Sequence, residues 1–191
     1  MGFLQQIKEN IAFRKAMKSL AKAYEEKLRF YQSMSKEDFM ALSDNELYDA
    51  AIARLEGYME QFYDDDDAMQ KALKQLSVPQ RVVYTLDYME REVNNGGLCQ
   101  FFVNSSRMVA PFVSQSLEAI TAVMHKELFD DFIADNNIDV NNLTSFICYD
   151  IEEFQGQYER YPFDAFDEKF YEYGTFEDAL TAYIIANKEA F

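Results

Sequence analysis

The feature that most constrains the fold is a break between two helical segments, Asn-Asn-Gly-Gly at residues 94–97. Asn95 and Gly96 adopt the left-handed conformation at little cost, so we expect the first helix to stop there. A second helix is expected to begin near Leu98. The buried face of the first helix is indicated by apolar residues three and four positions apart: Val82, Val83, Leu86, Met89 and Val93.

The rest of the chain also shows helical periodicity, and no segment has the convincing alternation of a strand. Capping-box signals, a serine three residues before Glu or Gln, precede two helices, at Ser43–Glu46 and at Ser77–Gln80. Thr175 is expected to cap the last helix. The sequence therefore predicts an all-α fold, a compact domain of about eight to ten helices. We expect helices at 3–34, 44–62, 67–76, 77–94, 110–124, 126–134, 143–160, 163–173 and 175–186.

Charge divides the chain into two parts. Residues 1–36 hold eight Lys and Arg against three Asp and Glu, whereas residues 37–191 hold ten against thirty-one, for a net charge of -16 overall. Such a segregation is typical of a protein with an interaction surface. We therefore expect a basic amphipathic helical extension at 1–36 and an acidic all-helical domain at 37–191.

The basic extension has the pattern of an amphipathic helix. Five basic residues are seven apart and share one slowly drifting stripe: Lys8, Lys15, Lys22, Arg29 and Lys36. An apolar stripe runs beside them: Ile7, Ile11, Met17, Leu20, Tyr24, Leu28 and Tyr31. A packed helix with a solvated face explains this pattern, and so does a helix that docks on a membrane or a partner. Its charge also suits the acidic domain or a second copy, which leaves a homodimer open.

Acidic residues are concentrated in the second part. Between Glu127 and Asp178 there are fifteen Asp and Glu and two Lys and Arg. Solubility explains such a surface, but carboxylates on successive helical turns, about 5 to 6 Å apart, also approximate the repeat of phosphates along a nucleic acid strand. The candidate partner-binding residues are Asp64, Asp65, Asp66, Asp67, Asp130, Asp131, Asp135, Glu152, Glu153, Asp164, Asp167, Glu168 and Glu172.

The charge pattern excludes some partners and favours others. Phosphate binding needs clustered Lys and Arg, so we do not expect the acidic domain to bind nucleic acid directly. A basic protein, for example a DNA-binding protein, suits the acidic surface better. No early apolar run or stretch of about eighteen apolar residues is present, so a cytoplasmic chain is expected, without membrane association.

No pattern of residues indicates catalysis or a metal site. His125 is the single histidine, and we interpret it as a surface or capping residue. The loop from Asp135 begins like a calcium-binding loop, but Val140 occupies the position that needs glycine and Phe146 that of the bidentate glutamate. Cys99 and Cys148 lack metal-type spacing and are predicted to be reduced core residues. We therefore expect no cofactor, no metal and no enzymatic activity.

The central motif supports a more specific hypothesis. Residues 92–97 (Glu-Val-Asn-Asn-Gly-Gly), followed by Gln-Phe-Phe at 100–102 and Asn-Ser at 104–105, resemble the signature of the bacterial DNA-mimic protein C-terminal-domain family, long regarded as a domain of unknown function. The resemblance covers about 75–185. It implies an all-helical, acidic protein that occupies the DNA-binding surface of a transcription factor or nucleoid protein. Thr121 stands where the family often has glycine.

The residues that match the motif are expected to be mainly structural: Asn94, Asn95, Gly96, Gly97, Gln100, Phe101 and Asn104. They can form turns and satisfy backbone groups around the bend. The leading hypothesis is thus a non-enzymatic interaction module, with DNA mimicry as its specific form. Two alternatives stay open: a small-molecule or catalytic pocket lined by Gln100 and Asn104, and a membrane-surface adaptor that uses the basic helix.

Overall fold

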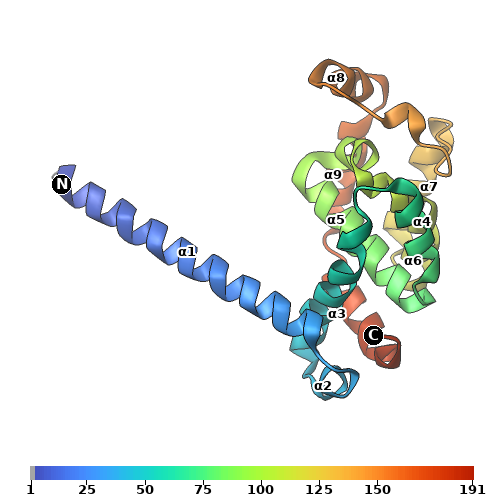
Figure 1. The fold of residues 1–191 in the computed structure, drawn as a ribbon. Helices are drawn as coiled ribbons and strands as arrows, with labels where there is room; N and C mark the ends of the chain where they lie inside the picture. Colours follow the sequence, from blue (N-terminus) through green and yellow to red (C-terminus); the bar gives the residue numbers. More distant parts are fainter. Residues whose placement is uncertain (1–2) are drawn as a thin grey trace.

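The computed structural model describes the backbone of residues 3–191 and the side chains from residue 13 onward. Over this range the chain forms ten α-helices and four short 3-10 turns without a strand, which confirms the all-α prediction (Figure 1). Ile7 and Ile11 of the predicted apolar stripe lie outside the described side chains. The α-helices are α1 (Phe3–Ser33), α2 (Lys36–Ala41), α3 (Asp44–Met59), α4 (Asp66–Gln75), α5 (Val78–Val103), α6 (Ala110–Ala119), α7 (Val123–Asp135), α8 (Ile151–Arg160), α9 (Phe163–Tyr173) and α10 (Glu177–Ala186).

The body of the molecule is organised around α5. This helix contacts α3, α6, α9 and α10, and its apolar face is fully buried. Aromatic rings fill the space between α5, α7, α9 and the 3-10 turn at Thr144–Phe146: the ring centroids of Phe102 and Phe146 are 5.0 Å apart, and those of Phe132 and Phe163 are 5.4 Å apart. Each such ring stabilises the fold by about 2 to 3 kcal/mol through burial alone.

The N-terminal helix α1 leaves the body as a long arm, and only its C-terminal turns pack against α3 (Figure 1). Tyr31 is buried there with 3% of its surface exposed, and Lys27 Nζ lies 2.6 Å from Asp49 Oδ2. Arg54 donates a hydrogen bond to the Met34 carbonyl oxygen, which fixes the end of the arm. Within residues 3–191, none of the helices combines the length and apolarity needed to cross a bilayer.

Local capping explains most helix starts. Both predicted capping boxes are present: Ser43 with Glu46, and Ser77 with Gln80. The short helix α2 was not predicted from the sequence, and it begins where the Ser35 hydroxyl accepts the Asp38 N–H at 3.0 Å. A serine followed by acidic residues thus started a helix too short to show periodicity.

Several predicted boundaries are wrong. The helices expected at 110–124 and 126–134 are instead α6, which ends at Ala119, and α7, which begins at Val123. Two other differences have a clear cause in capping. The helix expected at 143–160 begins only at Ile151, because the Asp150 carboxylate accepts the Glu153 N–H at 2.9 Å and caps a new helix there. Thr175 does not cap α10 either. The N-cap position belongs to Phe176, whose N–H donates to Glu90 Oε1 on α5 at 2.8 Å.

Candidate functional site

The central motif forms a sharp bend inside α5. Gly96 (φ -162°, ψ 25°) and Gly97 (φ 77°, ψ 177°) both leave the helical conformation. We predicted the left-handed conformation at Asn95 or Gly96, but it is Gly97 that has positive φ. A Cβ atom at Gly97 would lie 2.2 Å from Asp167 Oδ2, so this position needs glycine both for its backbone angles and for its space.

Asp167, on α9, caps the part of α5 that follows the bend. Its Oδ1 accepts the Leu98 N–H at 2.8 Å, and so satisfies a donor that the bend would otherwise leave unpaired. Burial raises the pKa of this carboxyl, and the hydrogen bond from Leu98 opposes the shift. Because Asp167 is buried, it is not part of the surface that a partner could contact.

The amides of the motif bind a carboxylate. Gln100 Nε2 and Asn104 Nδ2 donate to the same Glu92 Oε2, at 3.1 and 2.7 Å, across the bend. We expected these amides to satisfy backbone groups, but they hold together the two halves of α5 through a side chain. Asn94 and Asn95 are exposed, whereas Phe101 is completely buried. These contacts agree with a mainly structural motif.

The alternative pocket at the motif has no support in the geometry. A hollow of about 470 Å³ is lined by residues such as Arg54 and Tyr58, and neither Gln100 nor Asn104 lines it. Of the two roles expected for His125, surface or capping residue, the surface role is wrong because the side chain is buried. Its Nε2 lies 3.2 Å from the carbonyl oxygen of Gly174, the C-cap residue of α9. Burial lowers the pKa of His125 and raises that of the Cys99 thiol to about 12, so both are neutral at pH 7.

Three carboxylates form a row along α7. Glu127, Asp131 and Asp135 are four residues apart and all exposed, so they lie about 6 Å apart on one side of the helix. These three carboxylates and Lys169 line a hollow of about 380 Å³ between α7 and α9. Apolar side chains that also line it are Met124, Leu128, Phe132, Pro162 and Phe166. We call Glu127, Asp131 and Asp135 the α7 row.

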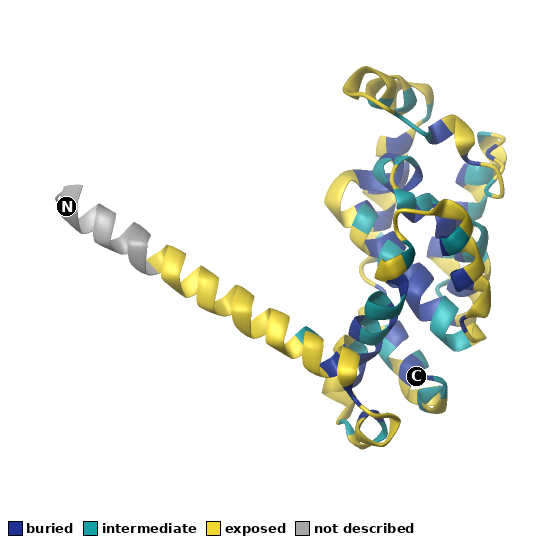
Figure 2. Ribbon diagram, viewed as in Figure 1, coloured by how far each residue is buried: buried dark blue, intermediate teal, exposed yellow. Residues whose placement is uncertain are grey.

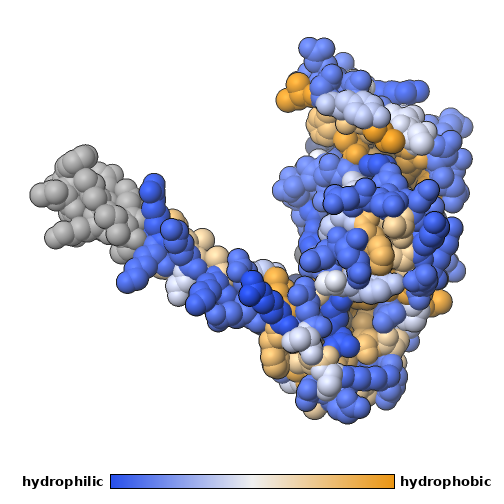
Figure 3. All heavy atoms as spheres, in the orientation of Figure 1, coloured by the Kyte–Doolittle hydropathy of each residue, from blue (hydrophilic) through white to orange (hydrophobic). Residues whose placement is uncertain are grey.

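A second row lies on the neighbouring helix. Asp164, Glu168 and Glu172 on α9 have the same four-residue spacing and are exposed, and α9 packs directly against α7. Among the described residues, neither this α9 row nor the α7 row has an ion-pair partner within 4 Å. Figure 3 shows hydrophilic residues over most of the visible face of the body, with apolar residues between them. The two rows therefore place six carboxylates on adjoining helices.

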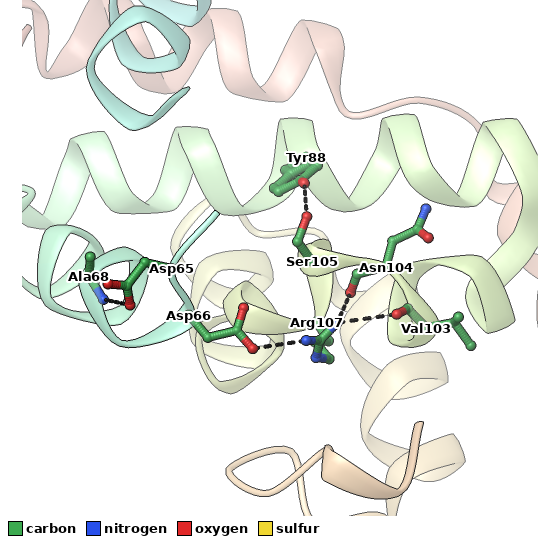
Figure 4. Close-up of polar contacts among 8 residues, drawn as sticks. All are labelled: Asp65, Asp66, Ala68, Tyr88, Val103, Asn104, Ser105 and Arg107. Atoms are coloured by element: carbon green, nitrogen blue, oxygen red, sulfur yellow. Dashed lines mark hydrogen bonds and ion pairs between the residues drawn. The ribbon is translucent and has the colours of Figure 1, made fainter. Parts of the chain in front are cut away.

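Two predicted carboxylates are neutralised by cations. Asp66 Oδ2 lies 2.9 Å from Arg107 Nη2, and the same guanidinium donates to the Val103 and Asn104 carbonyl oxygens (Figure 4). Asp130 Oδ2 lies 2.6 Å from Lys126 Nζ. Neither carboxylate therefore adds much to a negative surface.

The remaining predicted carboxylates lie at helix N-termini, away from the two rows. Asp65 caps α4 by accepting the Ala68 N–H at 2.9 Å (Figure 4), and Asp64 and Asp67 lie exposed beside it. Glu152 and Glu153 are exposed in the first turn of α8. These side chains stabilise helix starts, as expected for carboxylates near the positive end of a helix dipole.

Sequence reasoning missed one exposed carboxylate and two buried ones. Glu127 belongs to the α7 row, and its four-residue spacing from Asp131 would have found it. Asp87 lies inside the body, where it accepts the Tyr48 hydroxyl at 2.9 Å and pairs with Arg91 Nε at 3.1 Å. Burial raises the pKa of nearby Glu90 to about 7. Asp87 and Glu90 are each four positions after a member of the apolar face, Val83 and Leu86, so helical spacing could have found them.

Comparison with known proteins identifies a family for most of the body. A family model described as DMP19-like protein matches residues 74–187, more than half of the chain. The match contains the bend, the α7 row and the α9 row, and leaves α1 outside. Searches of curated proteins and of solved structures gave no match.

Proposed function

Because the chain belongs to the DMP19-like protein family, a family of DNA mimics, we propose that it binds a basic DNA-binding protein through its acidic helices. The α7 row and the α9 row are the binding surface in this proposal. A transcription factor or a nucleoid protein would contact them with the Lys and Arg side chains that otherwise contact phosphates. The chain would act as an interaction module, without catalysis.

The observation that carries this proposal is the charge density of the two rows. Four residues of α-helix rise about 6 Å, so each row carries one negative charge in about every 6 Å, and two such rows on packed helices together supply about one charge per 3 Å of helix length. A DNA strand carries one phosphate charge per roughly 3.4 Å along its axis. Carboxylates held on packed helices therefore offer a basic partner a charge spacing similar to that of one strand.

The environment of the rows also suits a protein partner. Their carboxylates are exposed and have no ion-pair partner among the described residues, and Asp164 alone accepts a hydrogen bond, from the Tyr158 hydroxyl. They therefore attract cations at long range and speed the encounter with a basic surface. The hollow between the helices contains Met124 and Leu128, which a partner side chain can cover. Lys169 is the one cation that lines it and reduces the charge only in part.

Capture from a bacterial lysate tests the proposal. The immobilised chain should retain basic proteins at about 50 mM salt and release them at about 500 mM, since screening shortens the reach of exposed charges. Duplex DNA added at low salt should also elute them. If the basic proteins stay bound to the chain when duplex DNA is added, the proposed DNA mimicry is contradicted.

A pair of variants with equal net charge locates the surface. The α7 variant carries Glu127→Gln, Asp131→Asn and Asp135→Asn, and the control carries Glu37→Gln, Glu60→Gln and Glu159→Gln. All six positions are exposed, so both variants should fold. The α7 variant should lose the proteins that duplex DNA elutes, and the control should keep them. Equal loss in both would show that only total charge matters.

The pocket at the motif is not a second candidate. Gln100 and Asn104 each donate one amide hydrogen to Glu92, so this carboxylate fixes the orientation of both side chains across the bend. The residues that could supply a nucleophile and a base, Cys99 and His125, make no hydrogen bond to each other.

A further inference from the structure

The arm formed by α1 carries an apolar stripe that its own body leaves uncovered. Phe13, Met17, Leu20 and Tyr24 are spaced by four, three and four residues, so they lie on one side of the helix. They are between 48% and 65% exposed (Figure 2). The stripe continues into Tyr31, which is buried against α3. It is therefore the uncovered extension of an interface that already exists within the chain.

Unpaired cations flank this stripe. Within the described part of α1, Arg14, Lys15 and Lys18 have no ion-pair partner, and all three are exposed. The later cations of the arm are paired: Lys22 with Glu26, Lys27 with Asp49 and Arg29 with Glu25. The distal part of the arm thus combines apolar side chains with three uncompensated positive charges.

The arm cannot reach the acidic rows of its own molecule. Its last turns are fixed to α3 by the burial of Tyr31 and by the contact between Lys27 and Asp49. From that anchor the helix points away from the body, and α7 lies on the opposite side of the body (Figure 1). A straight helix that is anchored at its C-terminal end and extends away from the body cannot bring its distal residues to α7. Whatever covers the stripe must come from another molecule.

We propose that residues 13–27 of one copy dock in the hollow between α7 and α9 of a second copy. The hollow has the complementary chemistry: apolar side chains between the helices and the three carboxylates of the α7 row at its edge. An amphipathic helix in an apolar groove is a common mode of recognition, with anchors at the spacing that the stripe shows. Two copies can exchange arms reciprocally, which doubles the contact and closes the dimer.

Charge favours a second copy over a lipid surface as the occupant. A membrane that attracts the arm must be anionic, and such a membrane repels the body, whose residues 37–191 carry a net charge of -21. The same negative charge attracts the arm of another copy. The dimer would also cover the α7 row, so a DNA-binding partner would have to displace the arm before it binds.

Charge reversal tests this proposal. One variant carries Arg14→Glu, Lys15→Glu and Lys18→Glu in the arm, and another carries Glu127→Lys, Asp131→Lys and Asp135→Lys in the hollow. Sedimentation velocity on the full chain at low salt should show a dimer for the original sequence. Each variant alone should have its dimer dissociation constant raised at least about thirtyfold. An equimolar mixture of the two variants should dimerise again, because each arm then meets a hollow of opposite charge.

Matched controls separate arm docking from general charge effects and from the proposed function. Reversal of Glu37, Glu60 and Glu159 changes the net charge equally and should leave the dimer intact. The arm variant keeps the α7 row, so it should still capture a DNA-binding partner. A chain that is monomeric at all concentrations would overturn the proposal, as would a dimer that survives both reversals. Arm-dependent binding to vesicles of phosphatidylcholine and phosphatidylserine by a monomeric chain would show a lipid occupant instead.

Discussion

Carboxylates in two regions of this protein have opposite roles. In the interior, Glu90 and Asp167 each accept a backbone N–H from another helix, and burial raises the pKa of both. On α7, Glu127, Asp131 and Asp135 are exposed and have no ion-pair partner among the described residues. The first group holds helices in place, whereas the second is available for binding. Acidic composition alone therefore does not identify a binding surface.

The largest effect on stability is expected at the bend beside Asp167. Gly97→Ala should lower the free energy of unfolding by about 3 kcal/mol or more, because the left-handed backbone strains alanine and the new Cβ meets Asp167. Urea unfolding followed by circular dichroism measures the change. Gly156→Ala is the control: its Cβ meets nothing within 4 Å, and alanine favours the helix. A small loss at Gly97 would show that the bend is easily rearranged.

The next effect concerns Asp167 itself. Asp167→Ala leaves the Leu98 N–H without its acceptor in the interior, which should cost about 2 kcal/mol of unfolding free energy. Glu168→Ala, one residue further on the exposed face, should change it by less than about 0.5 kcal/mol. The two measurements compare a buried and an exposed carboxylate on one helix. Similar values would remove the distinction between the two regions.

The pH dependence of stability should reveal Glu90. Its pKa is about 7 in the folded protein against an ordinary value of 4.5, so its charged form is disfavoured by folding. The stability that protonated Glu90 contributes to the folded protein is fully present below about pH 4.5 and is lost as the pH rises through about 7. Glu90→Gln should therefore raise the unfolding free energy by about 1 to 2 kcal/mol at pH 8, after allowance for partial exposure, and not at pH 4. An equal gain at both pH values would contradict this account.

The smallest effect is expected at the turn that leads into the α7 row. Thr121 has a φ of 58°, and the Ala122 N–H donates to the Leu117 carbonyl oxygen at 2.9 Å, as in a Schellman motif with its left-handed residue at Thr121. Thr121→Gly should increase the free energy of unfolding by roughly 0.5 to 1 kcal/mol, because it removes strain from a β-branched residue. The melting temperature should rise accordingly. A lower melting temperature would show that unfolded-state entropy outweighs this strain.

The sequence predicted the parts of the fold that local chemistry determines. Periodicity indicated the helical class, and the spacing of Ser43 from Glu46 and of Ser77 from Gln80 located two helix starts that the structure confirms. The family resemblance also identified Thr121 as a position where glycine is usual, and the structure shows a left-handed backbone there. These features depend on residues a few positions apart.

Features that depend on distant contacts were not predictable. Nothing near Glu90 or Asp167 shows that each caps a helix 86 or 69 residues away. The neutralisation of Asp66 by Arg107, 41 residues later, is equally invisible in a count of carboxylates. The candidate site was therefore predicted as a region rather than as two rows. Its members became clear only when packing separated exposed carboxylates from buried and paired ones.

The central claim is that the α7 row binds a DNA-binding protein. The most direct test takes a partner that duplex DNA elutes from the chain and measures its affinity for three chains at low salt. These are the original sequence, the α7 variant with Glu127, Asp131 and Asp135 neutralised, and its control of equal net charge. Calorimetric titration should show the α7 variant binding at least about tenfold more weakly and the control nearly unchanged. If the α7 variant binds as tightly as the original sequence, the row does not carry the interaction and the proposed mimicry is contradicted.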